Sequence, residues 1–342
     1  SVSNVLNKTK YVSPELVKRV NQAVEELSYE VNPIARSMKN KGTGLIGVIT
    51  EDLCGVFYPY VIRGINSVAV EKGYQLLICD AQGTYGSQIK RERELFRRLI
   101  SNRVDGIIFA STVSAENQEE YFRELLKEAN RYKRTPLISM ERDFTSVGID
   151  SVYFDSYGNA KKAVQHLIEC GCRKICHITG AQDLEIARDR VRGYKDCMDE
   201  NHLPYDKDMI ATGDYSHQSG YTAMKKLLEQ VPDMDGVFCG NDQMAIGALK
   251  AIKETGKRIP EDIKIMAYDD VFLSSVVEPS LSTIHIRKHH TGIKAAEILF
   301  HRLENPEDDS DVPIGIKMDA NLVIRQSTIG KGETEDWSLI DW

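Results

Sequence analysis

Gly44-Leu45-Ile46-Gly47-Val48-Ile49-Thr50 is the stretch that indicates the fold, and the polar pair Glu51-Asp52 follows it. A nearly continuous apolar run of this length, bounded by polar residues, is typical of a strand buried on both faces of a parallel sheet. Glycines 42, 44 and 47 match a dinucleotide-binding fingerprint by spacing alone. A phosphate-binding loop must follow a strand and open a helix, whereas these glycines precede and enter the strand. We therefore interpret the match as chance.

Strands and helices alternate after this run, as expected for a parallel sheet with helical crossovers. The predicted helices cover 58–72, 89–101 and 117–132, and the predicted strands cover 75–79, 106–110 and 136–140. After Ser151-Val152-Tyr153-Phe154 the pattern begins again. It then gives helices over 158–170, 187–201, 219–230 and 244–255, and strands at 174–178, near 212, at 236–239 and at 263–267. The sequence predicts two α/β bodies of similar build.

Composition limits the class of protein. The chain has 342 residues, 42% of them hydrophobic and 28% charged, as in ordinary soluble proteins. It contains no apolar run of membrane-spanning length and no signal-peptide pattern at its start. Seven cysteines spread over a long chain argue against a disulfide framework. These features favour a reducing cytoplasm.

Charge is unevenly distributed. Residues 1–43 contain seven Lys and Arg against four Glu, whereas the whole chain has a net charge of -7. Within this basic piece, Ser13-Pro14 is a helix start, and Val31 to Asn40 reads as a short helix too small to be stable alone. A basic N-terminal piece on an acidic body is typical of a modular nucleic-acid binder, and a merely solvated helical face is the alternative. We expect a further helix to precede residue 1.

Several segments resemble the lactose repressor / galactose repressor family of bacterial transcription regulators. They are Ser1 to Asn7, Tyr11 to Ser13, Ala23 to Tyr29, Ala35 to Met38, Asn241 to Ala245 and Ala267 to Asp270. The resemblance implies two doubly wound, periplasmic-binding-protein-like lobes behind a truncated helix-turn-helix headpiece and a hinge. It places the headpiece at 1–29 and the hinge at 30–43. The first lobe takes 44–153 and 287–318, the second takes 154–286 and 319–330, and residues 331–342 form a tail.

The resemblance also implies a small-molecule effector, most simply a sugar, bound in a cleft between the lobes. Ligands of such sheets bind beyond the carboxyl ends of the strands, where this chain carries polar residues. The expected effector-binding residues are Phe57, Tyr58, Ser111, Asp155, Arg190, Tyr215, Asn241 and Asp269. A simpler role exists for two of them, because Asn241 can cap the following helix and Asp269 can serve a turn.

The resemblance further implies a homodimer on a near-palindromic operator in double-stranded DNA. The expected DNA-binding residues are Ser1, Asn4, Arg36, Met38 and Lys39, with Met38 as an apolar wedge for the minor groove. Effector identity, operator sequence, the sign of the response and the role of the tail stay open.

Other classes of function find less support. Cysteines 170, 172 and 176 do not have the paired spacing of a zinc site, and Cys176 lies in a predicted buried strand. His285, His289 and His290 are expected at a surface or interface. The chain has no recognisable nucleophile elbow or phosphate loop, so neither an enzyme nor a cofactor is expected. A solute-binding receptor of a transporter is the alternative with the same two-lobed body.

Overall fold

We describe a computed structural model of the chain, which defines residues 2, 5, 11–27, 42–81, 88–111, 113–114, 116–131, 134–306 and 312–330. The chain divides into two compact units, Ser1–Gly44 and Leu45–Trp342. The described helices include none that is long and apolar enough to cross a membrane.

In the first unit, helix α2 spans Pro14–Glu26 with Ser13 at its N-cap position and Pro14 in its first turn, as predicted. The side chain of Ser13 makes no capping hydrogen bond. The apolar residues of α2 line an open groove together with Val2, and only Val20 among them is buried.

In the second unit, the first lobe is a six-stranded parallel sheet in the order β11-β5-β4-β3-β1-β2. Its strands are β1 (Leu45–Thr50), β2 (Gln75–Asp80), β3 (Gly106–Phe109), β4 (Leu137–Glu141), β5 (Asp150–Phe154) and β11 (Gly315–Met318). Its helices are α4 (Tyr58–Glu71), α5 (Gln88–Ser101), α6 (Gln118–Ala129) and α12 (Lys288–Glu304). The expected doubly wound lobe is present.

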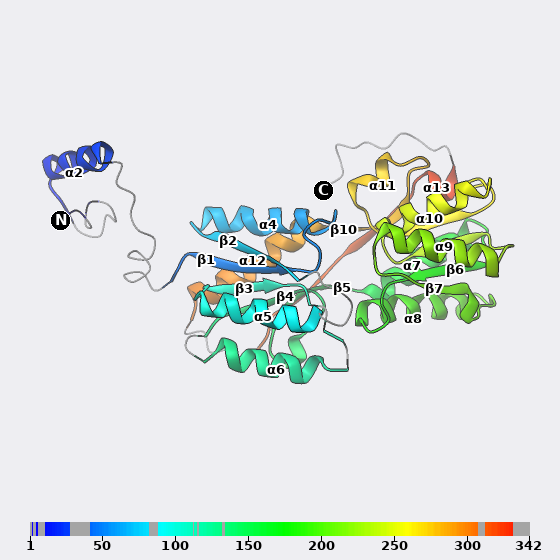
Figure 1. Cartoon of the computed structure of the whole chain (residues 1–342), viewed down its shortest axis with the longest axis horizontal. Helices are drawn as coiled ribbons and strands as arrows, with labels where there is room; N and C mark the ends of the chain where they lie inside the picture. The colour runs from blue at the N-terminus through cyan, green and yellow to red at the C-terminus, as the bar shows by residue number, and fades with distance from the viewer. Residues whose placement is uncertain are drawn as a thin grey trace. The chain divides into compact units, whose positions relative to one another are not determined.

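Residues that alternate along β1 pack into two different cores, which explains why the strand is apolar throughout. Ile46 and Val48 join the core beneath α4 and α12. Ile49 joins the core beneath α5 and α6, on the other face of the sheet (Figure 1). Gly47 packs on Leu99 of α5, so its place inside the strand agrees with the reading that the glycine spacing is chance.

The second lobe is a sheet in the order β12-β10-β9-β8-β6-β7. Its strands are β6 (Ile175–Thr179), β7 (Ile210–Thr212), β8 (Gly236–Cys239), β9 (Lys264–Asp269), β10 (Ser282–Ile286) and β12 (Ala320–Val323). Its helices are α7 (Ser156–Glu169), α8 (Glu185–Glu200), α9 (His217–Gln230), α10 (Asp242–Glu254), α11 (Phe272–Val276) and α13 (Gln326–Ile329). Strand β12 runs antiparallel to β10, so this sheet is not purely parallel.

The chain passes between the lobes at three places, after β5, after β10 and after β11 (Figure 1). At the second crossing α12 returns to the first lobe and packs tightly on α4. A Cβ atom on Gly64 would lie 2.0 Å from the carbonyl oxygen of His289, and one on Gly292 would lie 2.0 Å from that of Val61. Glycine is required at both positions because the two helix backbones touch.

Candidate functional site

Six side chains from the two lobes form a cluster at the carboxyl ends of the strands. Glu51 follows β1, Glu141 ends β4, and Tyr58 begins α4 in the first lobe. Arg190 on α8, Tyr215 after β7 and Asp269 at the end of β9 come from the second lobe. We call these residues the inter-lobe cluster. Its position is the one at which open α/β sheets bind ligands.

Electrostatic interactions link the side chains of the cluster across the two lobes. Tyr58 donates a hydrogen bond to Glu141. The positive charge of Arg190 in the other lobe also acts on Glu141 and lowers its pKa. Asp269 in turn feels the charges of Arg190 and Glu141. The lobes therefore share one electrostatic environment here.

The three carboxyl groups of the cluster are hard to ionise. Burial raises the pKa of Glu51 and of Asp269 well above their usual values, and the neighbouring charge of Glu141 adds to both shifts. Burial likewise raises the pKa of Glu141 to about 7, against the hydrogen bond from Tyr58 and the charges of Arg190 and Arg142. Perturbed groups of this kind gather at functional sites more often than elsewhere.

Arg190 is buried with hydrogen-bonding capacity left over. Its side chain is 8% exposed, and its Nη1 donates to the carbonyl oxygen of Gly240 over 2.5 Å. Its guanidinium lies 3.8 Å from the ring centroid of Tyr268. Its Nε has no hydrogen-bond partner among the described residues. A buried donor without a partner is costly, so this atom is poised for an acceptor on a ligand.

Backbone strain is concentrated at the same place. Of the six non-glycine residues with positive φ in the described part of the chain, Glu141, Tyr215 and Asp269 belong to the cluster and Asp270 adjoins it. Residues other than glycine are uncommon in this conformation. The strain persists only where the surrounding structure enforces it, and strained residues of this kind cluster at functional sites. The strain at Asp269, with φ 110°, aims its side chain differently from a regular strand end.

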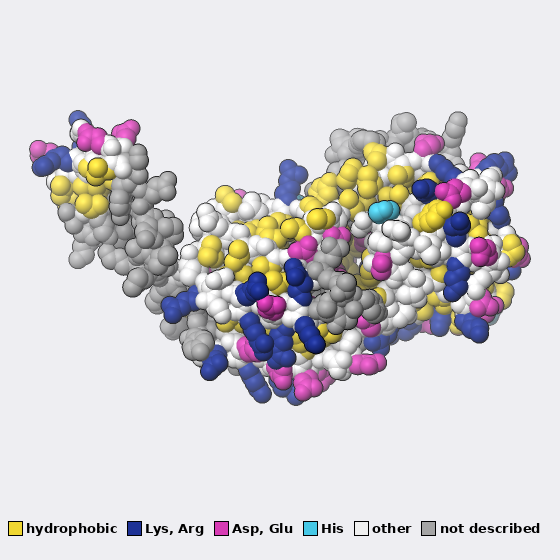
Figure 2. Space-filling view, viewed as in Figure 1, with side chains coloured by type: hydrophobic (Ala, Val, Ile, Leu, Met, Phe, Trp, Pro, Cys, Tyr) yellow, Lys and Arg dark blue, Asp and Glu magenta, His cyan; other side chains and the backbone are white. Residues whose placement is uncertain are grey.

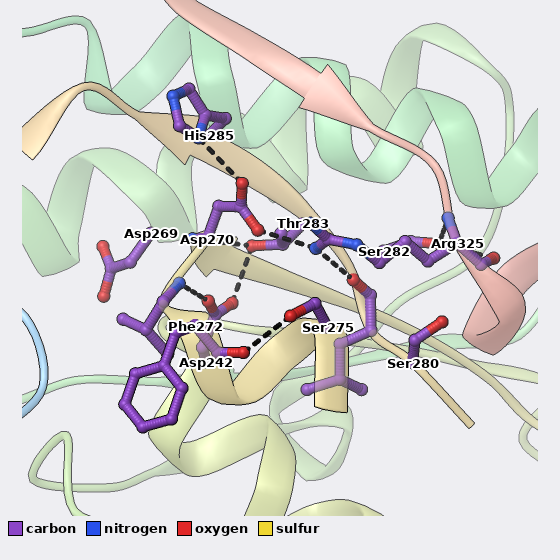
Figure 3. A network of polar contacts seen from close by, with 12 residues as sticks. Asp242, Asp269, Asp270, Phe272, Ser275, Ser280, Ser282, Thr283, His285 and Arg325 are labelled. Atoms are coloured by element: carbon purple, nitrogen blue, oxygen red, sulfur yellow. Dashed lines mark hydrogen bonds and ion pairs between the residues drawn. The ribbon is translucent and has the colours of Figure 1, made fainter. Parts of the chain in front are cut away.

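A polar network behind Asp269 holds the strained turn. Asp270 pairs with Nδ1 of His285 over 2.7 Å and with Nη1 of Arg325 over 2.6 Å. Burial would raise the pKa of Asp270, but these two partners bring it below its usual range. Figure 3 shows the carboxylate of Asp269 turned away from this network. His285 is thus buried, and the surface position expected for it is wrong because its ring pairs with a buried carboxylate.

Lys288, the first residue of α12, fixes the backbone of the turn. It is fully buried, and its Nζ donates to the carbonyl oxygens of Asp269, Asp270 and Ile286 over 2.7, 2.8 and 3.2 Å. A buried ammonium is tolerated when its donors are satisfied in this way. Lys288 therefore joins the strained turn of the second lobe to a helix of the first.

Three of the predicted effector-binding side chains have structural partners. Asn241 caps α10 by accepting from the Met244 N–H, and its amide donates to the carbonyl oxygen of Tyr215. Ser111 is buried and donates to Glu92. Asp155 caps α7 and pairs with Lys317 over 2.8 Å, which lowers its pKa. The interactions of the inter-lobe cluster given above involve neither Ser111 nor Asp155.

The aromatic predictions lie in or beside the cluster. Phe57 packs edge-to-face on Tyr58, with ring centroids 5.3 Å apart. The ring of Tyr215 lies against Gly180, where a Cβ atom would come within 2.0 Å of it. The Tyr215 hydroxyl has no hydrogen-bond partner among the described residues. Glu51, Glu141 and Lys288 were not among the predicted residues, although the rule of polar strand ends points to the first two.

The five predicted DNA-binding residues, Ser1, Asn4, Arg36, Met38 and Lys39, lie outside the described residues, as do most of the hinge and the tail. Cys176 is buried in β6, as its sequence context predicted. On the face shown in Figure 2, basic and acidic side chains are interspersed over the lobes.

Comparison with known proteins gives consistent matches. Residues 164–328 match the family of periplasmic binding protein-like domains. The HTH-type transcriptional repressor PurR of Vibrio atlanticus is 33% identical over 91% of this chain and 90% of its own length. The ribose operon repressor of Halalkalibacterium halodurans is 31% identical over 98% of this chain and 95% of its own length. The lac repressor dimer bound to operator and the anti-inducer ONPF is 25% identical, with a TM-score of 0.84 over 96% of this chain and 94% of that one.

Proposed function

This chain belongs to the lactose repressor / galactose repressor family of DNA-binding transcription repressors, and we propose that the inter-lobe cluster is where its effector binds. The family consists of transcription repressors rather than enzymes, and its members work in the cytoplasm. The observation that carries the proposal is Arg190, a buried cation with an unused donor among residues of both lobes. The solute-receptor alternative loses its support because the relatives that match almost the whole chain are repressors.

The effector that we propose is a sugar or a sugar derivative. Sugars present hydroxyl groups that donate and accept, together with flat apolar faces. Asp269 and Glu51 supply acceptors, Arg190 supplies a donor, and Tyr58 and Tyr215 supply aromatic surface. The comparison with a ribose operon repressor agrees with this class of ligand.

The DNA-binding part of the proposal rests on sequence and family membership. We propose that residues 1–29 form the headpiece, that 30–43 form the hinge, and that two copies of the chain bind a near-palindromic operator. Lys39 and Arg36 are assigned to phosphate and groove contacts, Met38 to the wedge, and Ser1 and Asn4 to the headpiece surface on DNA.

Effector binding would then change operator affinity through the angle between the lobes. A ligand held by both sheets favours one arrangement of the lobes over others by its differential affinity. The lobes in turn set the separation of the paired hinges, whose short helices need DNA and each other to fold.

The proposal is tested with protein expressed from its complete gene and a fluorescent pseudo-palindromic promoter fragment. We expect sequence-selective binding whose affinity falls steeply with added salt, since phosphate contacts release counterions. Sedimentation of the same sample is expected to give a dimer. Binding that ignores sequence, or that is absent at low salt, would refute the assignment.

A further inference from the structure

We propose that the effector carries a positively charged amino group alongside its hydroxyl groups, as an amino sugar or an amino polyol does. The inference rests on the proposed function, because it assumes that the inter-lobe cluster is the effector site. The observations that support the inference are the partners of the carboxyl groups and of the cations at the site.

The positive charges of Arg142, Arg190 and Lys288 act on the three carboxyl groups of the cluster only from beyond ion-pair distance. In the part of the chain that the structure describes, Glu51, Glu141 and Asp269 form no ion pair with Lys or Arg. They come from the ends of β1, β4 and β9, so both lobes contribute acidic groups to one place. A buried carboxyl group without a direct counter-charge tends to keep its proton, because ionising it there costs several kcal/mol, and a ligand cation can offset that cost.

The chain's own nearby cations are bound to other acceptors, mostly backbone oxygens, and Arg142 also pairs with Glu185 over 3.6 Å. Arg142 donates to the carbonyl oxygens of Ser111 and Val113, over 3.2 and 2.6 Å. Lys288 donates to three carbonyl oxygens, and Arg190 donates to that of Gly240. These hydrogen bonds fix the positions of the three cations. Burial is the main cause of the raised pKa values of Glu51, Glu141 and Asp269, and the nearby cations offset it only in part.

The unpartnered donor of Arg190 argues independently for a ligand with acceptors as well. Its side chain is buried, its Nε has no partner among the described residues, and Asp269 and Glu141 are among its charged neighbours. A ligand hydroxyl can accept from this N–H while an ammonium on the same molecule lies among the carboxylates. A polyhydroxylated amine meets both requirements, whereas a neutral sugar meets only the first.

The test compares matched probes in a thermal-shift assay at about 10 mM, since a ligand of the folded state raises its stability. The pairs are glucose with glucosamine, galactose with galactosamine, and sorbitol with 1-amino-1-deoxysorbitol. We expect at least one amine to raise the melting temperature while its neutral partner has little effect. Affinity for 1-amino-1-deoxysorbitol should rise from about pH 6 to about pH 8, as Glu141 loses its proton while the amine keeps its own.

Variants separate this reading from a general effect of charge. The double variant E51Q/E141Q keeps the shape of the site, and we expect it to bind the amine at least thirtyfold more weakly, as for a lost buried charge partner. The control E94Q/E304Q removes two exposed glutamates of the same lobe and should bind normally. The control variant should also retain operator binding.

Three outcomes would overturn the inference. Neutral sugars could stabilise the protein as well as their amine partners do, or E51Q/E141Q could bind the amine as tightly as the control. The third is that no amine shifts the melting temperature of protein that binds its operator. Loss of operator binding by the unmodified protein, in contrast, would refute the proposed function itself.

Discussion

Replacing Glu141 with Gln tests whether the inter-lobe cluster is held under electrostatic strain. Burial raises the pKa of Glu141 from a usual 4.5 to about 7. Because the folded protein holds this proton more tightly than the unfolded chain, the stabilisation is complete below about pH 4.5 and is lost as the pH rises through about 7. The shift corresponds to about 3 kcal/mol at most, and partial access of solvent reduces it to roughly 1–3 kcal/mol.

Glutamine keeps the acceptor for Tyr58 and never ionises, so Glu141→Gln should be more stable than the unmodified protein above neutral pH. For a protein of this size the gain corresponds to a melting temperature roughly 2–6 °C higher at about pH 8, with little difference near pH 4.5. The charged and titratable groups that face Glu141 are Glu51, Tyr58, Arg142, Arg190, Tyr215 and Asp269.

The assay is differential scanning fluorimetry of both proteins, and of a Glu94→Gln control, across this pH range. Glu94 is exposed on α5 and pairs with Arg98, so its replacement should give no pH-dependent gain. The melting temperatures of Glu141→Gln and the unmodified protein could instead differ by an amount that does not change with pH, or that grows toward acid pH. Either result would refute the claim that Glu141 is held under electrostatic strain.

Three further changes probe other parts of the account. Met38→Ser should weaken operator binding, measured by anisotropy, by at least about tenfold because an apolar wedge is lost. Effector affinity should stay nearly constant, and a fall in both affinities would contradict the hinge as a separate switch. Gly64→Ala places a Cβ atom against the His289 carbonyl and should cost about 2 kcal/mol or more in thermal unfolding, whereas Val70→Ala on the exposed side of α4 should cost little. Lys288→Met leaves three carbonyl oxygens without their donor, in two buried hydrogen bonds and one partly buried one. We expect a loss of about 3–5 kcal/mol of stability together with weaker effector binding, and an unchanged melting temperature would contradict its anchoring role.

Most of the sheet architecture could be predicted because its signals are local. The apolar run at β1, the turn signals and the helical periodicities each depend on neighbouring residues only. Helix α12 was not predicted, since it begins with Lys288, His289 and His290 behind Arg287, which is a poor N-cap. The antiparallel direction of β12 depends on its pairing with β10, a partner distant in the sequence.

The site was predicted less completely because side-chain direction is set by tertiary contacts. The strand-end rule placed Asn241 and Ser111 near the right edge of their sheets, but their hydrogen bonds go to Tyr215, Met244 and Glu92. The strained backbone that aims Asp269 depends on a lysine from another element. No local pattern signals that Lys288 will be buried.

Whether the inter-lobe cluster controls DNA binding is decided by operator affinity with and without effector, in the unmodified protein and in Arg190→Met. Methionine fills similar space but has no donor for the ligand. We predict that effector shifts the operator affinity of the unmodified protein by fivefold or more, within the usual range of allosteric coupling. Arg190→Met should bind operator normally and lose the response to effector. A full response in Arg190→Met would contradict the claim that the inter-lobe cluster controls DNA binding.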